Sequence, residues 1–100
     1  MKKYSVLLSP RAFRDLKDIY EYIANEKLSK ENAKSQTDRI KKAVMGLETM
    51  PQSHQERQVG RYARQGYRQL LVDNYLGIFR IDEENNTVYV ITIQYQRRNM

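Results

Sequence analysis

The fold is decided by residues 75–95, which read YLGIFRIDEENNTVYVITIQY. Two runs of mainly β-branched and aromatic residues, 75–82 and 87–95, flank a polar EENN stretch, and this pattern is typical of a β-hairpin. A third β-prone run, residues 66–72, precedes them and is separated from them by an Asp-Asn turn signal. The C-terminal half of the chain therefore predicts three consecutive antiparallel strands.

The N-terminal half predicts one strand and two amphipathic helices. Residues 3–9 are rich in strand formers, and the Ser-Pro pair that follows the leucines offers an N-cap hydroxyl and a first-turn proline to a helix over residues 10–26. Ser29 caps a second helix, which ends before Pro51. Apolar residues recur every three to four positions in both helices, so each helix presents one stripe to a core.

The element order β-α-α-β-β-β places the chain in the α+β class, with an antiparallel sheet and the N-terminal helical hairpin packed on one face. No internal repeat or long linker interrupts the sequence, so residues 1–100 predict a single domain. Both alternating faces of residues 75–82 are largely apolar, so the alternation leaves open which face lies under the helices.

Composition excludes several classes of function. The chain has no cysteine and a single histidine, His54, which excludes a disulfide scaffold, a cysteine nucleophile and a multi-histidine metal site. We find no ligands for a metal or an organic cofactor. No apolar run approaches the ~18–20 residues of a membrane span, and the N-terminus lacks the ~7–15 apolar residues of a signal peptide. A cytoplasmic location is expected.

Carboxylates on the first helix offer no catalytic pair. They are interleaved with basic residues at spacings of three and four, which is typical of surface ion pairs. The residues concerned are Asp15, Asp18, Glu21, Arg11, Arg14 and Lys17.

The charge distribution points to an anionic partner. The chain has eighteen basic and twelve acidic residues and thus a net charge of +6. This charge is suited to binding nucleic acid or an acidic protein. All lysines lie between Lys2 and Lys42, and the later basic residues are arginines only. These arginines are Arg57, Arg61, Arg64, Arg68, Arg80, Arg97 and Arg98.

Arginines and tyrosines together can bind a single-stranded nucleic acid, because tyrosine rings stack on bases and guanidinium groups bind phosphates. They can also cleave RNA without a metal, with arginine stabilising the phosphorane and a tyrosine moving the 2′-hydroxyl proton. The alternative is structural: half-buried aromatic residues of the sheet and a solvated basic tail. The tyrosines near the arginines include Tyr62 and Tyr95.

The chain resembles the RelE/ParE superfamily of toxins from type II toxin–antitoxin modules over essentially its whole length. The stretches that carry the resemblance are YSVLLSPRA (4–12), DLKDI (15–19), YI (22–23), GYRQL (66–70), NY (74–75), IFRID (78–82), VYVI (88–91) and YQRR (95–98), with Pro51 closing the helical hairpin. The resemblance implies a cytoplasmic bacterial growth inhibitor that a cognate antitoxin neutralises through an extended or helical segment.

The superfamily divides by target. RelE-like members cleave messenger RNA in the ribosomal A site, whereas ParE-like members poison DNA gyrase. Arg68 matches a basic position of the RelE-like site, but Leu76 stands where the nucleases often carry arginine, and no tyrosine or histidine follows Arg98. We therefore favour a ParE-like gyrase poison, with the ribosome-dependent endoribonuclease as the alternative.

Each alternative assigns its own residues. A nuclease would use Arg68, Arg80, Arg97 or Arg98 for phosphate and transition-state charge, with Tyr95 as general acid or base. A binding surface for nucleic acid or for the target would use Arg61, Arg64, Arg68, Arg97 and Arg98.

Overall fold

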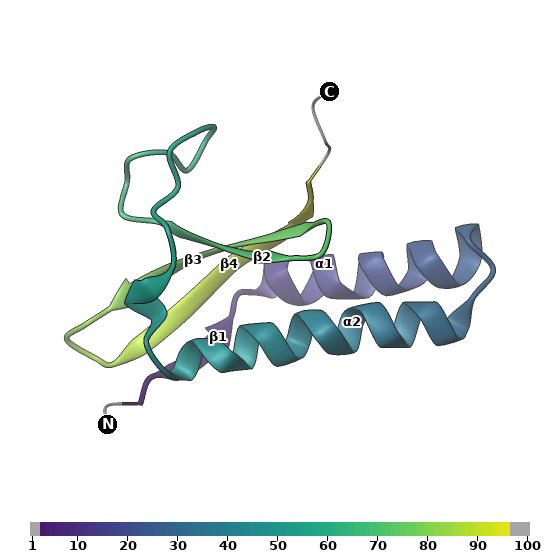
Figure 1. Cartoon of the computed structure of the whole chain (residues 1–100), viewed down its shortest axis with the longest axis horizontal. Coiled ribbons are helices and arrows are strands. Elements are labelled where there is room, and N and C mark those ends of the chain that lie inside the picture. Colours follow the sequence, from purple (N-terminus) through teal and green to yellow (C-terminus); the bar gives the residue numbers. More distant parts are fainter. Residues whose placement is uncertain (1–2, 97–100) are drawn as a thin grey trace.

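A computed structural model of the chain describes residues 3–96 and shows two helices against a four-stranded sheet (Figure 1). The strands are β1 Ser5–Leu8, β2 Arg68–Val72, β3 Tyr75–Asp82 and β4 Thr87–Tyr95, and the helices are α1 Pro10–Glu21 and α2 Lys30–Met45. A π-helical turn, Tyr22–Glu26, prolongs α1 to the predicted end, and 3-10 turns at Gly46–Glu48 and Pro51–Ser53 follow α2. The predicted α+β class and element order are confirmed.

The sheet is mixed, in the order β1-β4-β3-β2. The pairs β2/β3 and β3/β4 are antiparallel, as predicted from their short turns, but β1 pairs with β4 in parallel. The prediction of a wholly antiparallel sheet is therefore wrong at this one pair. The physical reason is the connection: β1 and β4 are separated by the helical hairpin and two strands, and a parallel pair requires a long crossover of this kind.

Both helices begin as their sequences predict. The Ser9 hydroxyl accepts a hydrogen bond from the Ala12 amide at 3.0 Å, and the Ser29 hydroxyl accepts one from the Asn32 amide at 3.2 Å. These N-caps satisfy amides that have no partner within the helix. No helix within residues 3–96 combines the length and apolar character needed to cross a membrane.

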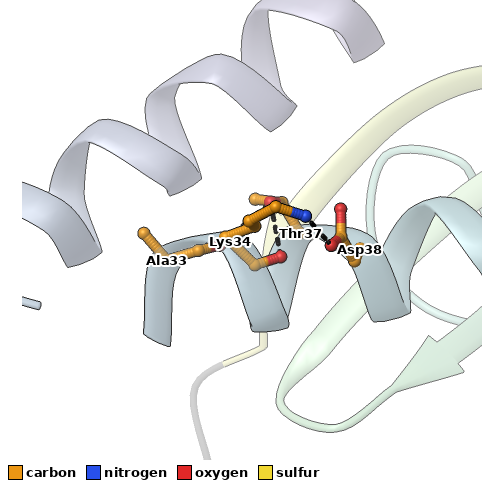
Figure 2. Close-up of polar contacts among 4 residues, drawn as sticks. All are labelled: Ala33, Lys34, Thr37 and Asp38. Carbon is orange, nitrogen blue, oxygen red and sulfur yellow. Dashed lines mark hydrogen bonds and ion pairs between the residues drawn. The ribbon is translucent and has the colours of Figure 1, made fainter. Parts of the chain in front are cut away.

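The buried and exposed sides of α2 differ in their polar contacts (Figure 2). Thr37 is buried, and its hydroxyl donates to the Ala33 carbonyl at 2.9 Å, so no polar group is left without a partner there. On the exposed side Lys34 pairs with Asp38 at 2.8 Å. This bond raises the pKa of Lys34 and lowers the pKa of Asp38.

The main core lies between the helices and one face of the sheet. Phe79 is fully buried on this face, where it packs with residues of both helices and of β4. The helical contributors are Ala12 and Leu16 from α1, and Ile40, Val44 and Leu47 from α2 and the turn after it. The helix-facing side of β3 is therefore the side of Phe79, which the sequence left open.

The loop of residues 57–67 lies on the side of the sheet opposite the helices, here called the outer face, and contacts part of it around Ile78 and Gln94 (Figure 1). Ile78 and Leu76 of β3 are only 1% and 3% exposed. Ile78 shares a pocket with Val59 and Tyr62 of this loop. Both faces of β3 therefore bury apolar side chains: Phe79 on the helix-facing side, and Leu76 and Ile78 on the outer face.

A bulge interrupts the pairing of β3 and β4. Ile78 pairs with Thr92 and the next residue, Phe79, pairs with Val90, so Ile91 is one residue in excess on β4. A bulge of this kind leaves backbone groups without ladder partners.

Two side chains near the start of α1 satisfy these groups. The Ser9 hydroxyl donates to the Ile91 carbonyl at 2.6 Å. The Asp15 carboxylate accepts from the Thr92 hydroxyl at 2.6 Å and from the Ile93 amide at 2.9 Å. The prediction that Asp15 forms a surface ion pair is therefore wrong, because α1 crosses β4 at the bulge and turns this carboxylate toward the sheet.

Candidate functional site

Arg68 lies at the start of β2, opposite Phe79 and thus on the helix-facing side. It is half-buried, and its Nη1 donates to the His54 carbonyl at 2.7 Å. The His54 ring meets the Phe79 ring edge-on, with 5.7 Å between centroids. Burial, and then the charge of Arg68, lower the pKa of His54 below 6.5, which favours the neutral imidazole. Arg68 thus helps to fix the segment before β2.

Arg80 lies on the outer face of β3 and is exposed. It pairs with Tyr89 of β4, and its guanidinium carbon lies 4.7 Å from the centre of that ring, which is a cation–π contact. Successive strand residues point to opposite faces, so Arg80 and Arg68 lie on opposite sides of the sheet.

Tyr95 lies at the other end of the sheet, opposite Tyr75. It is 63% exposed, and its ring lies 5.6 Å from the Tyr75 ring in an edge-to-face arrangement. Burial, and then Tyr95, raise the pKa of Tyr75. Tyr22 joins the two rings in lining a cavity of about 480 Å³. Tyr75 and Arg80 are five residues apart on β3, or about 17 Å at strand spacing.

The structure therefore does not bring Arg68, Arg80 and Tyr95 together. The remaining predicted catalytic residues, Arg97 and Arg98, lie outside the described residues.

The loop 57–67 carries two predicted binding residues, Arg61 and Arg64, and both are exposed. Two backbone hydrogen bonds close this loop: the Arg57 amide donates to the Tyr67 carbonyl at 2.7 Å, and the Arg64 amide donates to the Arg57 carbonyl at 3.0 Å. The loop is a defined element of the fold that carries arginines on its surface.

A small pocket, here called the basic pocket, lies between this loop and the outer face of the sheet. Its volume is about 170 Å³. The polar side chains that line it are Arg11, Arg57, Arg61, Tyr62 and Gln94. Of the predicted residues it contains Arg61.

Arg11 and Arg57 were not predicted as partners of Arg61. Arg57 lies in the half of the chain whose basic residues are all arginines, and this pattern is the sequence signal that points to it. Arg11 was assigned to surface pairing on α1, and only the tertiary fold brings it to the loop.

An apolar groove of about 690 Å³ runs between α1 and α2. Phe13 and Met45 line it although they are 61% and 51% exposed, and Tyr20 also faces it. Two lysines, Lys17 and Lys41, and one carboxylate, Glu21, lie at the same groove and leave it with a net positive charge. The groove thus joins exposed apolar surface to positive charge, which suits an amphipathic acidic segment.

Residues 3–96 hold no group of three histidine, cysteine or acidic side chains that could bind a metal ion.

Comparisons with known proteins give the family. Residues 6–100 match the sequence model of the family described as the ParE toxin of the type II toxin-antitoxin system, parDE. No curated protein matches the sequence.

Solved structures with the same fold include a chain of the chromosomal ParDE toxin–antitoxin system from P. aeruginosa, with a TM-score of 0.80, 18% identity, and coverage of 97% of this chain and 100% of that one. A chain of the RelBE2 complex from Mycobacterium tuberculosis has a TM-score of 0.63 and 22% identity, covering 96% and 94% of the two chains. A chain of the E. coli RelBE complex has a TM-score of 0.61 and 13% identity, covering 95% and 99%.

The family match extends over nearly the whole chain and agrees with the fold built above from the sequence. This protein belongs to the ParE toxin family of type II toxin–antitoxin systems.

Proposed function

We propose that this toxin inhibits growth by poisoning DNA gyrase and that a cognate antitoxin neutralises it. The observation that carries the gyrase proposal is the separation of Arg68, Arg80 and Tyr95 over two faces and two ends of the sheet. Metal-free RNA cleavage requires a proton-transfer group and phosphate-binding groups within hydrogen-bond reach of one phosphate. A gyrase poison needs only a complementary surface. The ParE family match further supports this target.

A ribosome-dependent endoribonuclease is the second candidate. The observation in its favour is the basic pocket, where Arg57 and Arg61 lie beside the phenol of Tyr62.

The test is made with purified components. The full-length toxin is added to DNA gyrase acting on relaxed plasmid, and in parallel to a translation reaction programmed with a defined messenger RNA. We expect loss of supercoiling with accumulation of cleaved plasmid, and intact messenger RNA. Messenger RNA cut in the ribosomal A site, with gyrase unaffected, would refute the gyrase proposal and support the second candidate.

The proposed docking site of the antitoxin is the apolar groove between α1 and α2. Similar solved structures include toxin–antitoxin complexes, and the groove exposes Phe13 and Met45 beside Lys17 and Lys41. An amphipathic segment with acidic flanks would cover the apolar residues and pair with the lysines.

The substitution Phe13→Glu tests this docking site, with Leu71→Glu as the matched control. Leu71 is 56% exposed on β2, away from the groove. We expect Phe13→Glu to remain toxic while escaping the antitoxin, and Leu71→Glu to remain neutralised. Full neutralisation of Phe13→Glu would place the antitoxin elsewhere.

A further inference from the structure

We propose that the basic pocket binds a phosphate group, supplied either by a nucleic acid backbone or by a small phosphorylated molecule. The site is distinct from the predicted set of Arg68, Arg80 and Tyr95. The inference does not depend on which target the toxin inhibits, because it rests on the electrostatics of the pocket alone.

Three positive charges cluster in the basic pocket. Arg11 comes from α1 and Arg57 and Arg61 from the loop, yet all three line one pocket of about 170 Å³. No carboxylate lines the pocket, and none of the three arginines forms an ion pair within residues 3–96. Bringing like charges together is unfavourable unless an opposite charge compensates them. A bound anion supplies that charge.

The position of Arg11 on its helix adds to this positive charge. It lies in the first turn of α1, a turn without acidic residues. The N-terminus of a helix carries partial positive charge, so a cation there is unfavourable whereas an anion is stabilised. The helix therefore adds to the positive potential of the pocket.

Contacts within the protein restrain the guanidinium groups of Arg57 and Arg61 before a ligand binds. The backbone of Arg57 is held by Tyr67 and Arg64, and its Nη1 donates to the Gln69 side chain at 2.9 Å. This bond orients the guanidinium and uses only one of its donors, which leaves others for a ligand. The Arg61 guanidinium carbon lies 6.0 Å from the centre of the Tyr62 ring, a contact that limits its orientations.

The donor set favours phosphate over carboxylate. Three guanidinium forks can contact several oxygens at once, and phosphate presents more oxygens than a carboxylate and, as a monoester or inorganic phosphate, more negative charge. The hydroxyl of Tyr62 and the amide of Gln94 add neutral donors on the wall of the pocket.

The test uses the full-length chain with two probes, inorganic phosphate and a fluorescein-labelled oligothymidylate of about twelve nucleotides. Phosphate binding is followed through the amide NMR shifts of Arg57 and Gly60 at constant ionic strength. Oligonucleotide binding is followed by fluorescence anisotropy over a range of salt concentrations. Far-UV circular dichroism confirms that each variant is folded.

The variants are Arg11→Gln, Arg57→Gln and Arg61→Gln, with Arg14→Gln as the matched control. Arg14 is exposed on the same helix as Arg11 and loses the same charge. We expect each pocket variant to weaken phosphate binding about tenfold, as for loss of a charge-assisted hydrogen bond. If a backbone phosphate is the ligand, each also lowers the salt slope of oligonucleotide binding by about 0.7.

The two probes separate the two sources. Pocket-dependent binding of both probes indicates a nucleic acid backbone, and pocket-dependent binding of inorganic phosphate alone indicates a small phosphorylated ligand. The proposal is overturned if neither probe binds, or if Arg14→Gln weakens binding as much as the pocket variants do, because diffuse surface charge would then explain the affinity.

Discussion

The substitution Asp15→Ala tests how α1 is fastened to the sheet. The Asp15 carboxylate accepts two hydrogen bonds from the bulge of β4, from the Thr92 hydroxyl and the Ile93 amide. Thr92 is 0% exposed and Ile93 is 3% exposed, so both donors are buried in the intact protein and depend on the carboxylate for a partner. An unsatisfied buried donor costs about 1–3 kcal/mol, and two of them cost about 2–6 kcal/mol.

This loss is a large fraction of the ~5–15 kcal/mol that stabilises a domain of this size. For a loss of about 3 kcal/mol the Tm falls by about 12–24 °C. Urea unfolding followed by far-UV circular dichroism measures the free energy of unfolding. In the Asp15→Ala background we expect Thr92→Val to raise the free energy of unfolding by about 1 kcal/mol, because it removes the hydroxyl that has lost its acceptor.

Asp18→Ala is the matched control, since Asp18 is an exposed carboxylate on the same helix with no hydrogen bond or ion pair within the described residues. Its free energy of unfolding should stay within about 0.5 kcal/mol of the wild-type value. If Asp15→Ala lowers the free energy of unfolding no more than Asp18→Ala does, the reasoning about the bulge is refuted.

Three other perturbations probe the rest of the fold. Phe79→Ala should lower the free energy of unfolding by about 3–5 kcal/mol in urea titrations, because it empties the centre of the core; a loss under 1 kcal/mol would contradict the packing described. The pKa of His54 is lower in the folded than in the unfolded state, so the unfolded chain binds more protons just below pH 6.5 and stability should fall as the pH falls through this range. A series of melts should show a flatter pH dependence for His54→Gln, and an unchanged slope would exclude His54 as the group responsible. Tyr89→Leu removes the ring beneath the exposed Arg80 and should cost less than about 1 kcal/mol in the same titrations, whereas a larger loss would indicate a buried role for that pair.

Local chemistry predicts much of this fold. β3 and β4 have the bounds that residues 75–82 and 87–95 predicted, because β-branched runs between polar turns leave few other conformations. Ser9 and Ser29 cap the two helices as predicted, because capping depends on neighbours within four positions.

What the sequence could not provide depends on distant contacts. The parallel direction of β1 is set by its partner β4, and the sequence of Ser5–Leu8 is compatible with either direction. Asp15 reads as a surface carboxylate until the bulge of β4 is placed opposite it.

The candidate sites also combine residues that the local sequence indicates with residues that only distant contacts bring together. The loop arginines Arg57 and Arg61 are visible as part of an arginine-only half of the chain, but their companion Arg11 is more than forty positions away. Arg11 lies near them only because β1 pairs with β4, which places the start of α1 beside the sheet. The assigned roles of all the predicted site residues stay predictions: Arg61, Arg64, Arg68, Arg80, Tyr95, Arg97 and Arg98.

The pairing of the first strand with the last also sets the timing of biogenesis. Ser9 and Ile91, which are hydrogen-bonded at this junction, are 82 positions apart. At synthesis rates of ~5–20 residues per second, the ribosome needs about 4–16 s to make the partner after the first strand has appeared. During this interval β1 has no strand to pair with, and the sheet on which every candidate site is built is incomplete. The sheet of this ParE-family chain can therefore close only after β4 has left the ribosome, however early β1 and the two helices are made.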